Sequence, residues 1–384
     1  MFRHGYSFAR NIRADLDGPI VGHSLEREHG GDVYKWAQKA RIDPAEIVDF
    51  SSSINPLGPP ASARKAFRRG YTEVSRYPDP YGEELKAALA KRHRMKPTEI
   101  LVGNGSTQLV YLLCFALRPR KALVVAPAFS EHANALILAG AKVRFLPLTP
   151  NGDFSFSAEN FLAAWAKADD MAFLTTPNSV TGRLISRAEI EKIARIALSS
   201  RRFLVIDEAF IDFVEGESVK QLVRDNPYLI ILRSLTKYYA LPGLRLGYLL
   251  AHSRTVARLA CYLEPWSVNG PAQRVALACL ADERFGLKTA RWLQREKNFL
   301  AQALVELKGF APYPSSTNFL LVRIANGTGA LELRSFLLKK KILIRACNSF
   351  AGLGSNHFRV AVRRRQDNRL LLNALREWTA GLLP

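Results

Sequence analysis

A lysine, a serine, an arginine and an aspartate near the middle of the chain have the types and spacing that chemistry on an aldehyde requires. Within SLTKYYALPGLRLGYL, residues 234–249, Lys237 follows Ser234 by three positions and precedes Arg245 by eight. Asp207 lies thirty positions before Lys237, at the end of the apolar run RRFLVI. A lysine amine can hold an aldehyde as a Schiff base, a hydroxyl and a guanidinium can hold a phosphate, and a carboxylate can keep a pyridine nitrogen protonated. Together these groups predict a pyridoxal-phosphate site in which Lys237 and Asp207 are catalytic.

The same S-x-x-K spacing occurs in penicillin-binding enzymes, where the serine is the nucleophile. Those enzymes also need S-D-N and K-T-G motifs, and the sequence contains neither. The run before Asp207 is typical of a buried parallel strand, so this acid is predicted at the carboxyl end of the strand, where α/β folds place their ligands. The pyridoxal-phosphate interpretation is therefore favoured, with Ser234 and Arg245 as phosphate ligands.

A glycine-rich turn supplies further cofactor-binding candidates. GNGSTQLVYLL, which starts at Gly103, is typical of a strand-to-helix turn, whose backbone N–H groups and helix N-terminus can hold phosphate oxygens. Gly105, Ser106 and Thr107 are predicted to bind the cofactor there. A simple helix cap gives the same pattern, and the turn gains weight from the Ser234 and Arg245 group that follows it.

Two aromatic residues are also predicted to bind the cofactor. Phe129, in PAFSEHA, can stack on the pyridine ring or belong to the core, and stacking is favoured. Tyr77, in RYPDPYG, has a hydroxyl that can reach a phosphate, or it sits in a loop. For His132 the sequence leaves open whether the side chain lines the site.

Composition places the chain among globular proteins of one large or two smaller domains. It has 384 residues, of which 48% are hydrophobic. Its four cysteines show neither metal-ligand spacing nor a paired framework, so we expect no metal site and a reducing cytoplasm. No apolar run is long enough to span a bilayer, and the first twenty-odd residues lack an apolar signal core.

The formal charge of +21 raises the question of nucleic-acid binding. Basic clusters lie at 64–69, 92–96, 339–341 and 363–365, dispersed through the chain, and no known nucleic-acid-binding motif accompanies them. A solvated basic surface that attracts anionic substrates is the favoured interpretation, and we expect no nucleic-acid partner.

Short apolar strands alternate with amphipathic stretches from about residue 99, which predicts βαβ units and a mostly parallel sheet of seven strands. The predicted strands span 99–103, 121–126, 142–148, 171–176, 203–207, 229–234 and 244–251. Residues 186–200 predict a helix that starts at a serine.

The remaining elements predict a smaller α+β domain at the C-terminus. The expected division is an N-terminal extension or arm, a segment that packs with the small domain, a large cofactor-binding domain and the small domain, at residues 1–28, 29–65, 66–270 and 271–384.

A series of motifs extends these observations over nearly the whole chain beyond the arm. In order from about residue 29 to 363 they are HGGDVYKWAQ, DFSSSINPLGPP, RYPDPYG, GNGS, TPNSVTG, DEAFIDF, LRSLTKYYALPGLRLGYL, PWSVN, ILIRAC and FRVAVR. The series resembles fold-type-I pyridoxal-phosphate enzymes of the histidinol-phosphate aminotransferase group, and within it most resembles the threonine-phosphate decarboxylases of cobalamin biosynthesis.

The resemblance implies roles for individual residues. Lys237 matches the Schiff-base lysine, Asp207 the partner of the pyridine nitrogen, and Ser234 and Arg245 the phosphate ligands. Arg359 matches the arginine that binds the substrate carboxylate. The residues implied at the substrate are His29, Gly30, Ser53, Asn55, Arg345 and Arg359.

Two positions depart from the pattern of the family. Ser179 stands where an asparagine usually meets the cofactor's phenolic oxygen, and Ser53 stands where the decarboxylases usually have asparagine next to the substrate. Serine keeps one donor but is shorter, so either water fills the gap, Asn178 or Asn55 compensates, or the activity has shifted.

The resemblance implies a reaction, its rivals and an assembly. The reaction is decarboxylation of O-phospho-L-threonine to (R)-1-aminopropan-2-ol O-phosphate for cobalamin biosynthesis. Alternatives are a histidinol-phosphate type aminotransferase, an O-phosphoserine decarboxylase and, outside catalysis, a nucleic-acid-binding protein on the same fold. A homodimer is also implied, in which Tyr77 reaches the cofactor of the partner.

Overall fold

The computed structural model describes residues 29–165, 169–325 and 329–381, so the predicted arm at 1–28 lies outside the described residues. Its largest element is a seven-stranded sheet in the order β2-β8-β7-β6-β5-β3-β4, in which β8 alone runs antiparallel to its neighbours. The strands are β2 Ile100–Gly103, β3 Lys121–Ala126, β4 Lys142–Pro147, β5 Met171–Thr175, β6 Phe203–Asp207, β7 Leu229–Ser234 and β8 Gly247–Ala251. The predicted mostly parallel sheet is confirmed, with each strand within three residues of its expected bounds.

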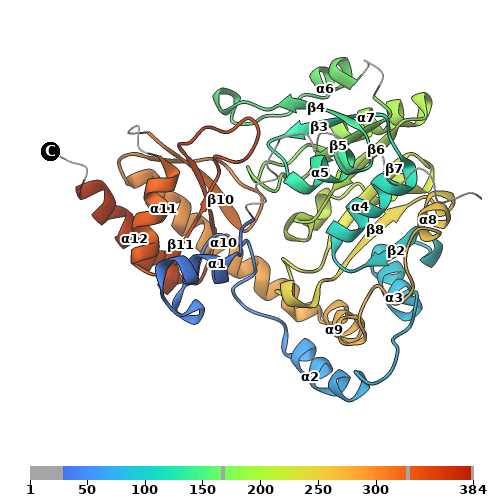
Figure 1. The fold of residues 1–384 in the computed structure, drawn as a ribbon, viewed down its shortest axis with the longest axis horizontal. Coiled ribbons are helices and arrows are strands. Elements are labelled where there is room, and N and C mark those ends of the chain that lie inside the picture. Colours follow the sequence, from blue (N-terminus) through green and yellow to red (C-terminus); the bar gives the residue numbers. More distant parts are fainter. Residues whose placement is uncertain (1–28, 166–168, 326–328, 382–384) are drawn as a thin grey trace, which may run out of the picture.

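Helices cover both faces of this sheet, as its continuously apolar central strands require. One face packs against α3, α6, α7 and α9, and the other against α4, α5 and α8 (Figure 1). Their bounds are α3 Glu83–His93, α4 Ser106–Leu117, α5 Ser130–Leu138, α6 Ala158–Trp165, α7 Arg187–Ser200, α8 Ser253–Ala260 and α9 Gly270–Leu280. The predicted serine start is present, because Ser186 caps α7 in a reciprocal capping box with Glu189.

A second, four-stranded antiparallel sheet lies at the other end of the molecule, in the order β12-β13-β10-β9 (Figure 1). Its strands are β9 Phe310–Pro312, β10 Phe319–Ile324, β12 Arg345–Ala346 and β13 His357–Ala361. The helices of this part are α10 Glu283–Glu306, α11 Ala330–Lys339 and α12 Arg365–Ala380. The large sheet and this smaller α+β part together form the predicted α/β architecture.

The segment before helix α2, Ala61–Gly70, joins this smaller part. Strand β1, Val48–Asp49, pairs in parallel with β11, Ile342–Leu343, and α1, Val33–Ala40, packs beside α11. Helix α9, by contrast, shares a hydrophobic cluster with the large sheet. The hydrophobic clusters of the two parts therefore meet near the start of α10. The expected domain boundary at residue 270 remains a prediction.

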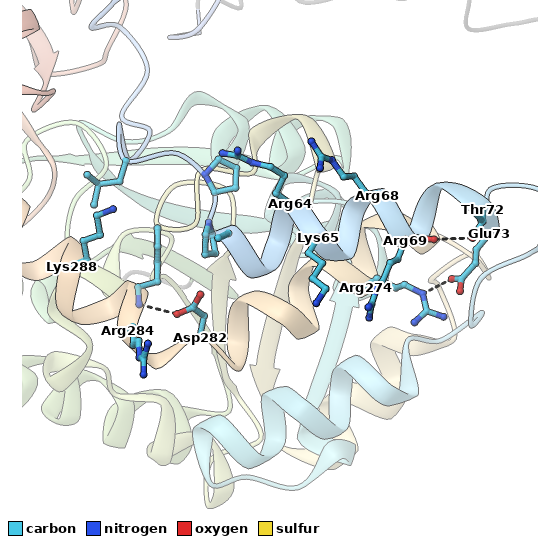
Figure 2. Close-up of a pocket in the computed structure, with 15 residues that line it drawn as sticks. Arg64, Lys65, Arg68, Arg69, Thr72, Glu73, Arg274, Asp282, Arg284 and Lys288 are labelled. Carbon is cyan, nitrogen blue, oxygen red and sulfur yellow. Dashed lines mark hydrogen bonds and ion pairs between the residues drawn. The ribbon is translucent and has the colours of Figure 1, made fainter.

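Helix α2, Ala61–Gly70, lies along α9 at the edge of the large part. Its first basic cluster, Arg64, Lys65, Arg68 and Arg69, extends into a hollow beside α9 and the start of α10 (Figure 2). No helix among the described residues is long and apolar enough to cross a membrane.

Candidate active site

A cavity of about 450 Å³ opens at the carboxyl ends of β5, β6 and β7, between the two parts of the molecule. The structure brings thirteen of the predicted site residues to its wall. They are His29, Gly30, Ser53, Ser106, Thr107, Phe129, Ser179, Asp207, Ser234, Lys237, Arg245, Arg345 and Arg359. Parallel sheets place their ligands at this edge, so the location agrees with the chemistry expected of these side chains.

Lys237 follows β7 and presents its amine to the cavity. Burial, together with the positive charges of Arg359 and Arg245, lowers the pKa of this amine to about 8. A lysine with such a pKa is neutral in a useful fraction near physiological pH and can attack a carbonyl. The electrostatics therefore suit the predicted role.

Asp207 ends β6 and is buried beneath the cavity. One carboxylate oxygen lies 3.0 Å from Nε2 of His132, and the other accepts a hydrogen bond from the backbone N–H of Ala209 at 2.9 Å. His132 is fully buried and stacks on Phe173, with ring centroids 5.0 Å apart. The histidine whose place the sequence left open is thus a partner of Asp207 and fixes the direction of the carboxylate.

A phosphate cradle forms where α4 begins. Gly105 has φ of 81°, and a Cβ at this position would lie 2.7 Å from Nη2 of Arg245. The helix has no side-chain cap, so its first N–H groups are directed at the same space as the Arg245 guanidinium. Ser234 lines this space and bonds Thr236, with 2.8 Å between the hydroxyl oxygens. Only glycine allows this close approach, and the donor set fits a phosphate dianion.

Arg359, from β13, lines the cavity on the side of the smaller part. Its guanidinium donates to the backbone carbonyl oxygens of Ser179 and Ser51, and it lies 4.8 Å from the ring of Phe319. It forms no ion pair within the described ranges 29–165, 169–325 and 329–381, and burial lowers its pKa to about 10. A buried guanidinium without a carboxylate partner is suited to binding an anion that enters from outside.

His29 and Glu131 form a pair that the sequence did not predict. Nε2 of His29 lies 3.3 Å from the Glu131 carboxylate, which also accepts from the Tyr111 hydroxyl and, at 3.1 Å, from Asn134. Glu131 is only 5% exposed and lines the cavity. It belongs to no recognised motif, and its place within PAFSEHA, next to Phe129, is the only sequence signal that pointed to it.

The two serines that depart from the family pattern share an unusual property. The hydroxyls of Ser53 and Ser179 are buried at the cavity and have no hydrogen-bond partner in the part of the chain that the structure describes. A buried hydroxyl without a partner costs free energy unless a ligand supplies one. These two groups, with the phosphate cradle, fit a polar group seated in the cavity.

Three predicted cofactor or substrate residues do not line the cavity. Gly105 contacts the Arg245 guanidinium, which lines the cavity in its place. Asn55 uses its side chain to bond the backbone of Tyr238 and the hydroxyl of Thr289, and its N–H donates to the Lys237 carbonyl. It therefore holds the Lys237 segment in place and does not line the cavity, so its role at the substrate stays a prediction. Tyr77 lies on the surface, 84% exposed, with its ring tilted against that of Trp266 at 4.8 Å between the centroids.

Neither asparagine compensates for the two serines. The side chain of Asn178 bonds the Pro127 carbonyl and the N–H groups of Val180 and Thr181, so it is turned away from the cavity. Asn55 is committed as well. Two explanations for serine in place of asparagine at Ser53 and Ser179 therefore stay open, a bridging water and a shifted activity.

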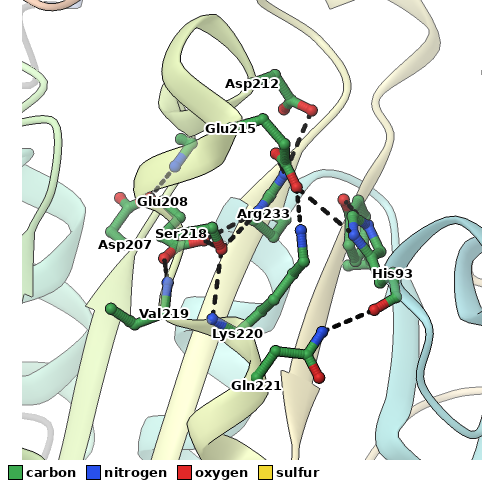
Figure 3. A network of polar contacts seen from close by, with 12 residues as sticks. His93, Asp207, Glu208, Asp212, Glu215, Ser218, Val219, Lys220, Gln221 and Arg233 are labelled. Atoms are coloured by element: carbon green, nitrogen blue, oxygen red, sulfur yellow. Dashed lines mark hydrogen bonds and ion pairs between the residues drawn. The ribbon is translucent and has the colours of Figure 1, made fainter. Parts of the chain in front are cut away.

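A buried ionic network supports the strand ends from below (Figure 3). Arg233 precedes Ser234, is fully buried, and lies 2.9 Å from a Glu208 oxygen and 3.3 Å from an Asp212 oxygen. Burial raises the pKa of both Glu208 and Asp212. For Glu215 burial acts in the same direction, but the charges of Arg233 and Lys220 outweigh it and lower the pKa to about 2.

The network ties together the strands that carry the site. Glu208 follows Asp207, and Ser218 donates to Glu208 at 2.7 Å while it accepts from Arg233 at 3.2 Å. Since neighbouring residues of a strand point to opposite faces, Asp207 and Ser234 face the cavity while Glu208 and Arg233 lock the strands on the far side.

Comparison with known proteins agrees with this geometry. Residues 45–375 match the family model described as aminotransferase class I and II. The chain belongs to this family. Among its relatives, threonine-phosphate decarboxylase of Salmonella typhimurium is 38% identical, over 93% of this chain and 98% of the relative. The adenosylcobalamin biosynthesis bifunctional protein CobDQ of Leptospira interrogans is 30% identical, over 90% of this chain and 40% of the relative.

A solved structure shows that the family fold extends to aminotransferases. The histidinol-phosphate aminotransferase of Clostridium acetobutylicum has a TM-score of 0.81 and 27% sequence identity, over 86% of this chain and 99% of that chain. The family cofactor, pyridoxal 5′-phosphate, is the cofactor of this chain. The unpartnered serines, the phosphate cradle and the Lys237 amine fit it, whereas no cluster of potential metal ligands occurs among the described residues.

Proposed function

We propose that the protein decarboxylates O-phospho-L-threonine to (R)-1-aminopropan-2-ol O-phosphate, a step of cobalamin biosynthesis. The 38% identity to threonine-phosphate decarboxylase over nearly the whole of both chains carries the proposal. The printed name of the CobDQ relative supports the pathway. The cavity adds a chemical reason, because it gathers the unpaired Arg359 cation, Arg345 and His29 for a substrate with both a carboxylate and a phosphate.

The cofactor would be held by Ser234, Arg245 and the start of α4 at its phosphate, and by Asp207 at its ring nitrogen. When bound, pyridoxal phosphate supplies an electron sink for the pair left behind as carbon dioxide departs. Asp207, oriented by His132, keeps a positive charge at the ring nitrogen favourable. Lys237 supplies an amine that takes up and returns a proton near neutral pH.

Arg359 decides which bond breaks. It would hold the substrate carboxylate in the orientation that favours loss of carbon dioxide, whereas an orientation that favours loss of the α hydrogen would lead to transamination. Arg359 is fixed by the backbone of Ser51 and Ser179, so its guanidinium offers one direction to the substrate carboxylate. Arg345 bonds the Ala346 carbonyl and the Ser349 hydroxyl, which positions a second cation beside it.

His29 and Glu131 are proposed to select for the phosphate of the substrate. Glu131 orients the imidazole, and Gly30 allows the chain to pass close to Ser51, where a Cβ would lie 2.2 Å from a carbonyl oxygen. Discrimination between phosphothreonine and phosphoserine rests on one methyl group, which is worth about 1 to 3 kcal/mol.

The deciding experiment measures carbon dioxide and amine formation from O-phospho-L-threonine by cofactor-loaded protein, with and without 2-oxoglutarate. Release of carbon dioxide without the keto acid is expected. Glutamate formation that depends on the keto acid would instead identify an aminotransferase. As a control, Lys237→Ala is expected to lose activity and the visible absorbance band of the cofactor, and an unchanged band would contradict the assignment of Lys237.

We also propose a homodimer, in which Tyr77 reaches the cofactor site of the partner subunit. The exposed ring of Tyr77, which lies against the exposed ring of Trp266, supports this, since aromatic residues are enriched at interfaces. Light scattering is expected to give a dimer, and a fully active monomer would contradict the proposal.

A further inference from the structure

A second hollow, of about 1060 Å³, lies between α2, α9 and the start of α10 (Figure 2). We call it the basic pocket. It shares no wall residue with the candidate active site. Its cationic residues are Arg64, Lys65, Arg68, Arg69, Arg274, Arg284 and Lys288. Its size is that of a small-molecule site, and seven cations in one hollow set it apart from an ordinary solvated helix face.

The two acids at the basic pocket do not neutralise it. Glu73 pairs with Arg274. Asp282 caps α10 by accepting from the N–H of Phe285 at 3.1 Å, and it accepts from the Ser62 hydroxyl at 2.9 Å. Its carboxylate is therefore committed to the backbone and to a neutral partner.

The other six cations have no ion-pair partner in the part of the chain that the structure describes. Four of them come from α2 as two pairs, Arg64 with Arg68 and Lys65 with Arg69, and the members of each pair are four residues apart and lie on the same side of the helix (Figure 2). Like charges at this spacing repel one another and weaken the helix. An arrangement that costs stability in the free protein is relieved when a multivalent anion binds.

We propose that the basic pocket binds a small molecule with several phosphate groups, such as a nucleoside triphosphate. Guanidinium groups bind phosphate oxygens in pairs, and closely spaced cations favour a chain of phosphates over a single one. An apolar strip of Leu57, Pro59, Pro60 and Phe285 lines the same hollow and provides a surface for a base or ribose. This site is independent of the proposed decarboxylation.

Calorimetric titration of the cofactor-loaded protein with ATP, tripolyphosphate and inorganic phosphate tests the proposal, since the cofactor then occupies the other phosphate site. Tripolyphosphate is expected to bind at least about tenfold more tightly than inorganic phosphate, because several charge-assisted contacts replace one. Tighter binding of ATP than of tripolyphosphate would assign the apolar strip to the nucleoside. Equal affinities for tripolyphosphate and inorganic phosphate would overturn the proposal.

A double variant, Arg64→Ala with Arg68→Ala, locates the site. Removal of two guanidinium contacts is expected to weaken ATP binding at least about tenfold. The matched control is Arg195→Ala with Lys308→Ala, which removes the same charge from exposed positions outside the pocket and is expected to leave affinity unchanged. Equal losses in both double variants would show a nonspecific charge effect and overturn the proposal. So would stronger competition by duplex DNA than by tripolyphosphate, because it would identify a nucleic-acid surface.

Discussion

The two sides of strands β6 and β7 differ in whether their buried polar groups have partners of opposite charge. On the far side, Glu208 and Arg233 belong to a network in which the buried charges face partners. On the cavity side, the buried hydroxyls of Ser53 and Ser179 have no hydrogen-bond partner, and Arg359 has no carboxylate partner, among the described residues. The difference separates support from function: charges paired with opposite charges hold the strands together, even where a single atom such as Nε of Arg233 lacks a hydrogen bond, whereas an unpaired polar group at a cavity is held ready for a ligand.

The largest effect is expected from the supporting network. Arg233→Met leaves Glu208 and Asp212 as buried acids without their cation, so the free energy of unfolding of the cofactor-free protein should fall by about 3–5 kcal/mol. Denaturant titration measures it. The control Arg195→Met, at an exposed position without an ion pair to any described residue, should stay within about 0.5 kcal/mol of the parent. An equal, small effect at both sites would remove the distinction between the two sides.

Replacement of Lys237 should have the opposite effect and raise the free energy of unfolding. Its pKa falls from 10.5 to about 8 on folding, so at pH 7 the buried charge destabilises the cofactor-free protein by at most about 3 kcal/mol. Lys237→Met should therefore raise the stability of that form. Because the unfolded chain binds more protons between pH 8 and 10.5, the parent should gain stability over this range and the difference should vanish above it. Thermal melts from pH 7 to 10.5 check this, and a gap independent of pH would exclude the lowered pKa as its cause.

A variant of Glu131 tests whether the charge that orients His29 contributes to substrate binding. Glu131→Gln keeps the shape but removes the negative partner of the imidazole, so KM for O-phospho-L-threonine should rise about tenfold, equivalent to about 1.4 kcal/mol, with a smaller change in kcat. Steady-state kinetics measure both constants. Cofactor affinity serves as the control and should not change. A loss in kcat alone would assign Glu131 to the chemical step.

The smallest effects come from a matched set of serine variants. Ser218→Ala removes a hydroxyl that bonds Glu208 and Arg233, and should cost about 1 to 2 kcal/mol of stability. Ser53→Ala and Ser179→Ala remove hydroxyls without partners, so the stability of the cofactor-free protein should stay unchanged or rise slightly. Denaturation of all three variants gives the comparison. A loss at Ser179 as large as that at Ser218 would mean that its hydroxyl has a partner in solution.

The sequence predicted the large sheet because its strands are buried on both faces and read as continuous apolar runs, such as FLVID and LIILRS. It also predicted which residues gather at the cavity, since each of Asp207, Ser234 and Lys237 sits at or just after a strand end. The directions of side chains on helices were harder to predict. Glu131 and His132 are adjacent on α5, yet one faces the cavity and the other lies under it against Asp207.

Other contacts join positions far apart in the chain and have no local signal. Asn55 was predicted at the substrate, but it bonds Tyr238 and Thr289 because three segments meet there. Arg233 lies near the end of the apolar run LIILRS, and only the fold shows the acids gathered around it. Tyr77 faces solvent in a single subunit, so its predicted role depends on an assembly and stays a prediction.

The lowered pKa of Lys237 also gives the protein a site for selective chemical labelling. Ordinary lysines stay almost fully protonated at pH 7.5, and their ammonium groups are poor nucleophiles. An amine with a pKa of about 8 is far more often neutral at that pH, so a small acylating probe that enters the cavity should label Lys237 ahead of the many lysines on the surface. Such a probe would report, in a crude extract, how much of the protein still has an open site.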